Sequence, residues 1–175
     1  MKPWMSQQEI NTIIKHLNKT DTMLEYGCGG STLFFSMYVQ EYYSVEHNET
    51  WYNKIKPQIK SNTNLFHVNI NSGPAEAPNR IFPHSWDELD ASSRSKDFYD
   101  YIRYPGTLGK KFDAVLIDGR ARPECAKFIK DYIIDDGVMF MHDYWDRPLY
   151  HVVEEQFEVI DYVKSGQSLA VFRKK

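Results

Sequence analysis

The stretch from Met23 to Leu33 constrains the fold of this chain most strongly, because it predicts a buried strand, a tight turn and the start of a helix. Apolar and aromatic residues open it, and three glycines follow that permit positive φ angles and a close approach to a ligand: Gly27, Gly29 and Gly30. Ser31 or Thr32 can then cap the helix. A helix N-terminus behind a glycine turn offers free N–H groups and a positive dipole end. We therefore expect a nucleotide or nucleoside site, the alternative being a strand-to-helix turn without a ligand.

The rest of the chain alternates between expected strands and helices. A first helix is expected over residues 4–17, where Ser6 and Glu9 form a capping-box pattern. Strands are expected over 41–47, 64–70, 112–118, 138–143, 158–163 and 168–172. Further helices are expected over about 31–39, from residue 48 or 49, over 97–103, from Pro123 to about 133, and after Arg147 and Pro148. Asp136 and Gly137 are expected to form a turn.

This alternation predicts an α/β fold with a mostly parallel sheet and helices on both faces. The last two strands are close enough in sequence to form an antiparallel hairpin around Gly166. The 175 residues fit a single domain, 1–175. An irregular insertion is expected at about 71–96, where prolines and serines cluster, and we expect it to shape the choice of substrate.

Polar residues gather where the expected strands end. In a parallel sheet, ligands bind outside the carboxyl ends of the strands. The residues at these ends are Glu25 and Gly27, Glu46, Asn69 and Asn71, Asp118, and His142 with Asp143. The sequence therefore predicts one polar crevice along this edge.

The glycine pattern separates two kinds of nucleotide site. A dinucleotide fingerprint has a third glycine where this chain has Thr32. A nicotinamide-dependent reductase is therefore the weaker alternative.

The sequence resembles class I S-adenosylmethionine-dependent methyltransferases over nearly its whole length. The resemblance rests on Glu25–Thr32, on Ser44–Asn48, on Phe112–Arg122 and on the final strand pair. The Ile-Asp-Gly-Arg-Ala-Arg run at Ile117–Arg122 is similar to a small subgroup of the family. The resemblance implies a Rossmann-like, seven-stranded methyltransferase fold that binds S-adenosyl-L-methionine.

The resemblance also implies roles for individual residues. The glycine turn would hold the methionine part, Glu46 the ribose hydroxyls, and the loop after Ile70 the adenine, where Asn69 and Asn71 replace the acid that the family often has. The residues expected to bind the cofactor are Glu25, Gly27, Gly29, Ser31, Thr32, Glu46, His47 and Asp118.

Methyl transfer to a neutral hydroxyl requires alignment of the two reactants and removal of a proton. His142, Asp143 and Asp118 are the candidate catalytic residues, with the imidazole as general base and a carboxylate orienting it. The alternative is that His142 and Asp143 only satisfy backbone groups of the loop.

Some methyltransferases of this class that act on sugar or catechol hydroxyls hold magnesium with acids at these two strand ends. Asp118 and Asp143 match such acids, but His142 stands where the sugar enzymes carry another acid, so a divalent metal is possible and not favoured.

Each group of residues around the expected site has two possible roles. Arg120 and Arg122 could clamp an anionic acceptor or the methionine carboxylate, or form surface ion pairs. Five aromatic residues could line an acceptor pocket or fill a core: Phe82, Trp86, Tyr104, Tyr144 and Trp145.

Composition narrows the possible partners. The formal net charge of −3 does not favour nucleic acid, so a small-molecule or glycan acceptor is expected. Two separated cysteines, with neither a signal peptide nor a membrane span in the sequence, indicate the cytoplasm. A homodimer is possible, and the competing function is a non-catalytic nucleoside- or partner-binding module on the same fold.

Overall fold

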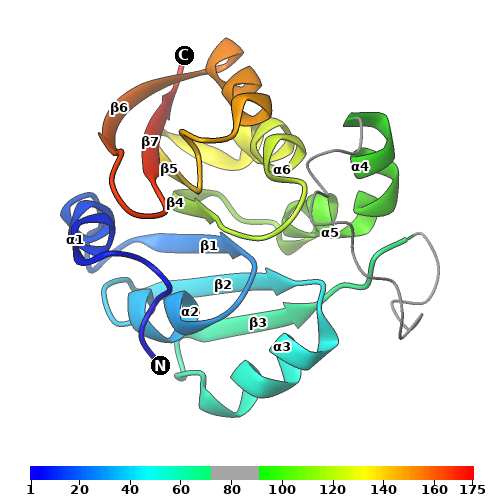
Figure 1. Cartoon of the computed structure of the whole chain (residues 1–175). Helices are drawn as coiled ribbons and strands as arrows, with labels where there is room; N and C mark the ends of the chain where they lie inside the picture. Colours follow the sequence, from blue (N-terminus) through cyan, green and yellow to red (C-terminus); the bar gives the residue numbers. More distant parts are fainter. Residues whose placement is uncertain (72–90) are drawn as a thin grey trace.

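The computed structural model describes residues 1–71 and 91–175, and these form a seven-stranded sheet in the order β3-β2-β1-β4-β5-β7-β6 (Figure 1). The strands are β1 (Thr22–Tyr26), β2 (Glu41–Glu46), β3 (Thr63–His67), β4 (Phe112–Ile117), β5 (Ile133–His142), β6 (Phe157–Val163) and β7 (Leu169–Lys174). The pairs among β1 to β5 are parallel, whereas β7 runs antiparallel to both β5 and β6. The predicted fold class and the terminal hairpin are therefore confirmed.

Helices cover both faces of the sheet, as predicted. The α-helices are α1 (Gln7–Lys15), α2 (Gly30–Phe35), α3 (Glu49–Ile55), α4 (Ala91–Asp97), α5 (Tyr99–Arg103) and α6 (Arg122–Ile129). The 3₁₀ helices are η1 (Lys56–Gln58), η3 (Tyr104–Leu108), η4 (Lys130–Tyr132) and η5 (Pro148–Glu155).

Successive residues of a strand point to opposite faces of the sheet. The apolar central strands therefore contribute side chains to two separate hydrophobic cores. Met23 packs with Ile10 and Ile13 of α1 on one face. Leu24 packs on the other face, in the core that includes residues of α5, α6 and η5. Both cysteines are free, as their separation in the sequence predicted.

Several predicted boundaries were wrong for identifiable reasons. The first helix begins at Gln7 and not at Trp4, because the Ser6–Glu9 capping box fixes its start. Asp136 and Gly137 belong to β5 and form no turn. A Cβ on Gly137 would lie 3.0 Å from the Asp113 carbonyl oxygen, so this glycine permits a close approach of two strands.

The predicted insertion at about 71–96 is only partly covered, since residues 72–90 lie outside the described part of the chain. Its last part was predicted wrongly, because α4 begins at Ala91. Arg94 holds this serine-rich helix to α6, with its Nη2 atom 2.8 Å from Glu124 Oε1. Such a contact between distant residues cannot be recognised from local composition.

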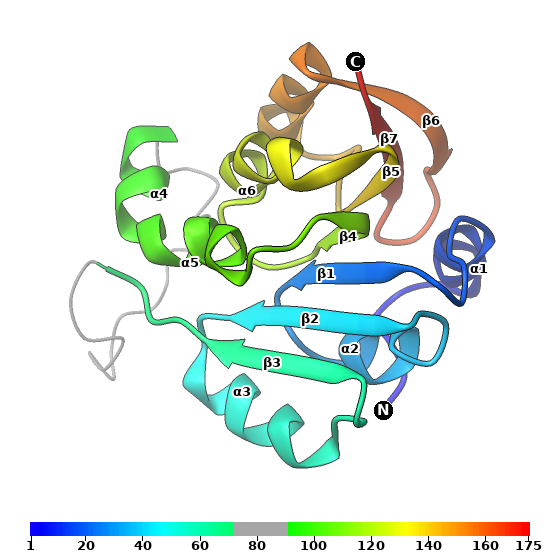
Figure 2. The ribbon, with the colours of Figure 1, turned by 180° about the vertical axis from the view of Figure 1, so that it is seen from behind.

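The strand directions place the candidate site. The arrowheads of β1, β2 and β3 point to the same edge in Figure 1, and Figure 2 shows the same alignment from behind. Helix α1 lies beside the turn that joins β6 and β7 in both views. Among the described residues, no helix has the length and apolar character needed to cross a membrane.

Candidate active site

A cavity of about 600 Å³ opens at the carboxyl edge of the sheet. Its walls come from the glycine turn, the ends of β2, β4 and β5, helix α3 and the N-terminal segment. The lining residues include Gly27, Cys28, Gly29, Gly30, Ser31, Glu46, His47, Asp118, His142 and Asp143, which the sequence placed at this edge, and also Lys2, Trp4, Trp51, Lys54, Arg120 and Arg122. Its volume suits a cofactor-sized ligand.

Gly27 is the residue that the turn most requires. Its φ angle is 104°, and a Cβ there would lie 3.2 Å from the backbone of Gly119. The Gly27 N–H donates to the Val45 carbonyl at 2.8 Å, and the Ser44 hydroxyl donates to the Gly27 carbonyl at 2.6 Å. The turn is thus held against β2 and against the loop that follows β4.

Glu25 lies beneath the turn and is not among the residues that line the cavity. Its carboxylate is buried and accepts hydrogen bonds from the hydroxyls of Ser31 and Thr32, the latter at 2.5 Å. Thr32 Oγ1 also accepts the Gly29 N–H at 2.9 Å. Burial raises the pKa of Glu25 to about 8. Glu25 and Thr32 therefore support the turn from below, whereas Gly29 and Ser31 face the cavity.

Glu46 brings an ionised carboxylate to the cavity wall. Oε2 accepts the N–H of Cys28 at 2.7 Å, and Oε1 accepts that of Asn48 at 2.6 Å. His47 Nδ1 lies 3.1 Å from Oε1. Burial alone would raise the pKa of Glu46, but the neighbouring His47 and the hydrogen bonds from the N–H groups of Asn48 and Cys28 outweigh it and hold the pKa below its ordinary value. Such a carboxylate can accept hydrogen bonds from a vicinal diol.

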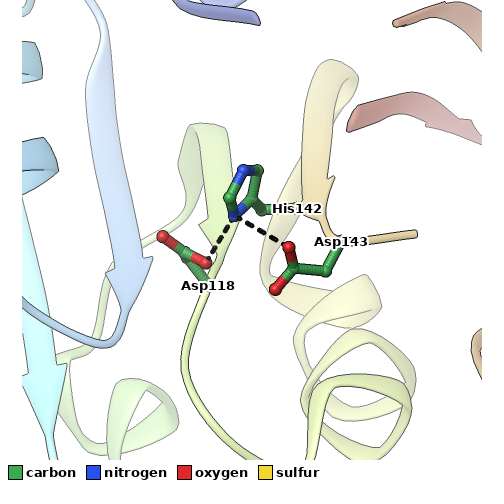
Figure 3. A group of neighbouring side chains, drawn as sticks. All are labelled: Asp118, His142 and Asp143. Carbon is green, nitrogen blue, oxygen red and sulfur yellow. Dashed lines mark hydrogen bonds and ion pairs between the residues drawn. The ribbon is translucent and has the colours of Figure 1, made fainter. Parts of the chain in front are cut away.

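Asp118, His142 and Asp143 meet where β4 and β5 end (Figure 3). His142 Nδ1 lies 2.9 Å from Asp118 Oδ1 and 3.7 Å from Asp143 Oδ1, and the imidazole side chain is 3% exposed. Burial would lower the pKa of His142, but the hydrogen bond and the charge of Asp118 prevail and raise it. Burial would likewise raise the pKa of Asp118, but His142 and Arg122 lower it. The pair therefore favours an imidazolium beside a carboxylate.

Arg122 is buried and lies between the two acids rather than on the surface. Its Nη2 atom is 3.0 Å from Asp143 Oδ2 and 3.4 Å from Asp118 Oδ1. The same guanidinium donates to the carbonyl of His142 and, at 3.1 Å, to that of Gly119. Arg120 lines the cavity as well.

The donor atoms of Asp118, His142 and Asp143 all lie within 4.8 Å of one another, a spacing that a metal ion could bridge. Arg122 contacts both carboxylates, and Arg147 Nη2 lies 3.7 Å from Asp143 Oδ2, so two guanidinium groups offset the negative charge that would favour a dication. The residues present therefore suit proton chemistry better than magnesium.

Other predicted positions lie away from the cavity. Asn69 is exposed, and Asn71 exchanges hydrogen bonds with Asp100 of α5, from its amide nitrogen at 2.6 Å and to its oxygen at 3.0 Å. Among the five aromatic candidates, Tyr144 lies in the core that includes residues of α5, α6 and η5, and Tyr104 and Trp145 pack against it. Phe82 and Trp86 lie outside the described residues.

Glu9 was not predicted as a site residue. Glu9 is fully buried on α1, and its Oε1 atom lies 3.4 Å from His142 Nε2. The only signal in the sequence was its place in the capping box, which uses Oε2. Trp51 and Lys54 were also missed, and both lie on the α3 side of the cavity.

Solved structures of other proteins share the fold of this chain. No protein-family model matches the chain, and no curated protein matches it by sequence. Among solved structures, a methyltransferase-like protein from Silicibacter pomeroyi matches with a TM-score of 0.69 and 25% identity, over 99% of this chain and 88% of that one.

Two further solved structures are less similar in sequence. A TehB-like SAM-dependent methyltransferase from Corynebacterium glutamicum matches with a TM-score of 0.60 and 14% identity, over 95% of this chain and 87% of that one. An rRNA methylase from Streptococcus thermophilus matches with a TM-score of 0.62 and 13% identity, over 97% of this chain and 98% of that one. The subgroup marked by Ile117–Arg122 stays a prediction. The chain therefore has the Rossmann-like class I fold of S-adenosylmethionine-dependent methyltransferases.

Proposed function

We propose that this protein transfers a methyl group from S-adenosyl-L-methionine to a hydroxyl of a small molecule or carbohydrate. The glycine turn would cradle the methionine part of the cofactor, with Gly27 and Gly29 allowing close approach and Ser31 at the helix N-terminus. Glu46 would accept hydrogen bonds from the ribose hydroxyls, and His47 would flank them. The ionised state of Glu46 and its place on the cavity wall support this assignment.

The observation that carries the acceptor chemistry is the meeting of Asp118, His142 and Asp143 on the wall of the same cavity. In the proposed step, the acceptor oxygen attacks the methyl carbon, the bond from that carbon to sulfur breaks, and the hydroxyl proton moves to His142 Nδ1. The products are a methyl ether, S-adenosylhomocysteine and an imidazolium stabilised by the neighbouring carboxylates. Asp118 would also contact the cofactor.

A small acceptor fits this chain better than a nucleic acid. The solved structures with this fold include an rRNA methylase, but this chain has a formal net charge of −3. Arg120 lines the cavity and would hold an anionic group, either of the acceptor or of the cofactor.

Incubation with methyl-labelled cofactor and a panel of sugars, catechols and alcohols tests the proposal. Label should move to one class of hydroxyl, with S-adenosylhomocysteine released in equal amount. The matched control is His16→Ala. His16 pairs with Asp161 of β6 and neither residue lines the cavity, so this variant should keep the activity that His142→Ala loses. Transfer that survives His142→Ala unchanged would overturn the general-base role.

One observation favours a second candidate, a non-catalytic binding module. Both ring nitrogens of His142 face carboxylates, which is also how a purely structural histidine is held. This candidate predicts that the protein binds S-adenosylhomocysteine and methylates nothing in the panel. A fluorescence titration with NADH tests the reductase alternative.

A further inference from the structure

Glu9 places a buried carboxylate next to the His142 ring. It is 0% exposed, and its Oε2 atom accepts the Ser6 N–H at 2.6 Å in the capping box of α1. Oε1 has no hydrogen-bond partner among the described residues, and neither has His142 Nε2. These two atoms lie 3.4 Å apart. Each atom is therefore the nearest available hydrogen-bond partner for the other.

The groups around His142 come from four elements. Glu9 of α1 faces Nε2, while Asp118 at the end of β4 and Asp143 beyond β5 face Nδ1. Arg122 of α6 pairs with the two aspartates. Only the Nδ1 side has neighbours that are themselves partly exposed, with Asp118 at 24% and Asp143 at 19%.

This asymmetry decides which ring proton is held more firmly. If Nε2 lost its proton, Glu9 Oε1 would be a buried carboxylate oxygen with no donor among the described residues, which is energetically unfavourable. If Nδ1 lost its proton, Asp118 would keep Arg122 and solvent as partners. The 2.9 Å separation of Nδ1 and Asp118 Oδ1 is a hydrogen-bond distance, and Nδ1 donates across it when the ring carries both protons.

We infer that Glu9 is a positioning residue that retains the Nε2–H of His142 and so leaves Nδ1 as the nitrogen that accepts the proton from the substrate. The inference rests on the proposed function, and it makes α1 part of the active site. The turn between β6 and β7 covers the same carboxylate, since a Cβ on Gly166 would lie 3.5 Å from Glu9 Oε2.

The experiment is two-bond ¹H–¹⁵N NMR of His142 at a pH where the ring is neutral. The wild-type ring should carry its proton on Nε2. Glu9→Ala should move it to Nδ1, where Asp118 is the remaining acceptor, whereas the amide oxygen of Glu9→Gln should keep it on Nε2. Methyl transfer should fall about 100-fold in Glu9→Ala and much less in Glu9→Gln, with S-adenosylhomocysteine affinity unchanged in both.

Ser6→Ala is the matched control, because it removes the hydroxyl that caps Glu9 N–H at 3.3 Å and leaves the carboxylate in place. It should lower the melting temperature and leave the tautomer on Nε2. A wild-type ring with its proton on Nδ1 would overturn the inference without any variant, as would an unchanged tautomer in Glu9→Ala. If the tautomer behaves as predicted but no substrate is methylated, the proposed function fails and the positioning of the ring stands.

Discussion

Glu46 is the residue on which the proposed cofactor site depends most. Its two oxygens fix the backbone at Cys28 and at Asn48, so the same carboxylate shapes the turn and faces the cavity. A hydrogen bond to a charged group contributes about 1.5–3 kcal/mol. Removing the charge should therefore weaken ligand binding more than it weakens folding.

Glu46→Gln is expected to weaken S-adenosylhomocysteine binding by about 10- to 100-fold, which is that hydrogen-bond range expressed as affinity. Calorimetric titration measures the loss. Glu41→Gln is the control, since Glu41 begins the same strand and pairs with Lys110 at 2.7 Å, away from the cavity. Equal losses in the two variants would contradict a specific role for Glu46.

His142 should give methyl transfer a pH dependence. The pKa of His142 is raised above 6.5 in the folded protein, so the ring keeps its proton at pH values where a free histidine has lost it. A general base must be neutral, so the single-turnover rate should rise with pH through this raised pKa. His142→Ala should lose about 10²- to 10⁴-fold in rate together with that limb of the profile. A wild-type profile that is flat or falls over this range would contradict the role of base.

At the scale of elements, the site depends on a turn whose geometry admits only glycine at one position. Gly27 has a positive φ angle and touches Gly119, whereas Gly29 is extended and a Cβ there meets nothing within 4 Å. The two glycines look alike in the sequence and differ in what the fold demands of them.

Gly27→Ala is therefore expected to destabilise the protein by about 1–3 kcal/mol and to weaken ligand binding, because an L-residue is strained there and its Cβ meets backbone. Gly29→Ala should leave the free energy of unfolding nearly unchanged. Urea unfolding of both variants measures the difference. Similar stabilities for the two would show that the turn is not constrained as described.

Local patterns were sufficient to predict most elements and were insufficient for contacts between distant ones. The apolar runs of β4 and β5, the Gly166 turn and the polar strand ends could all be predicted from neighbouring residues. Gly137 was mistaken for a turn residue, because its close approach to Asp113 is visible only in the sheet. Glu9 was missed because its capping-box role accounts for one carboxylate oxygen, while the other meets a histidine from the far end of the chain.

In the molecule as a whole, the cavity is formed by segments that lie far apart in the sequence. The N-terminal segment passes so close to α2 that a Cβ on Gly30 would overlap the carbonyl of Lys2. On another wall, two guanidinium groups, those of Arg122 and Arg147, contact the carboxylates of Asp118 and Asp143 and offset their charge. This charge balance favours proton chemistry over metal binding at the site.

Removal of divalent metal is expected to leave methyl transfer unchanged. EDTA treatment followed by dialysis, with the rate measured before and after addition of magnesium, checks this. The reason is that Arg122 and Arg147 already contact the two carboxylates that a metal would need and offset their charge. A rate that falls on chelation and returns with magnesium would instead assign Asp118 and Asp143 as metal ligands.

Calorimetric titration with S-adenosylhomocysteine is the decisive test of the proposed cofactor site, because every proposed role depends on this ligand entering the cavity beside Glu46. We expect saturable binding to one site per chain, weakened in Glu46→Gln and retained in Glu41→Gln. Absence of binding at high micromolar ligand would contradict the proposed site.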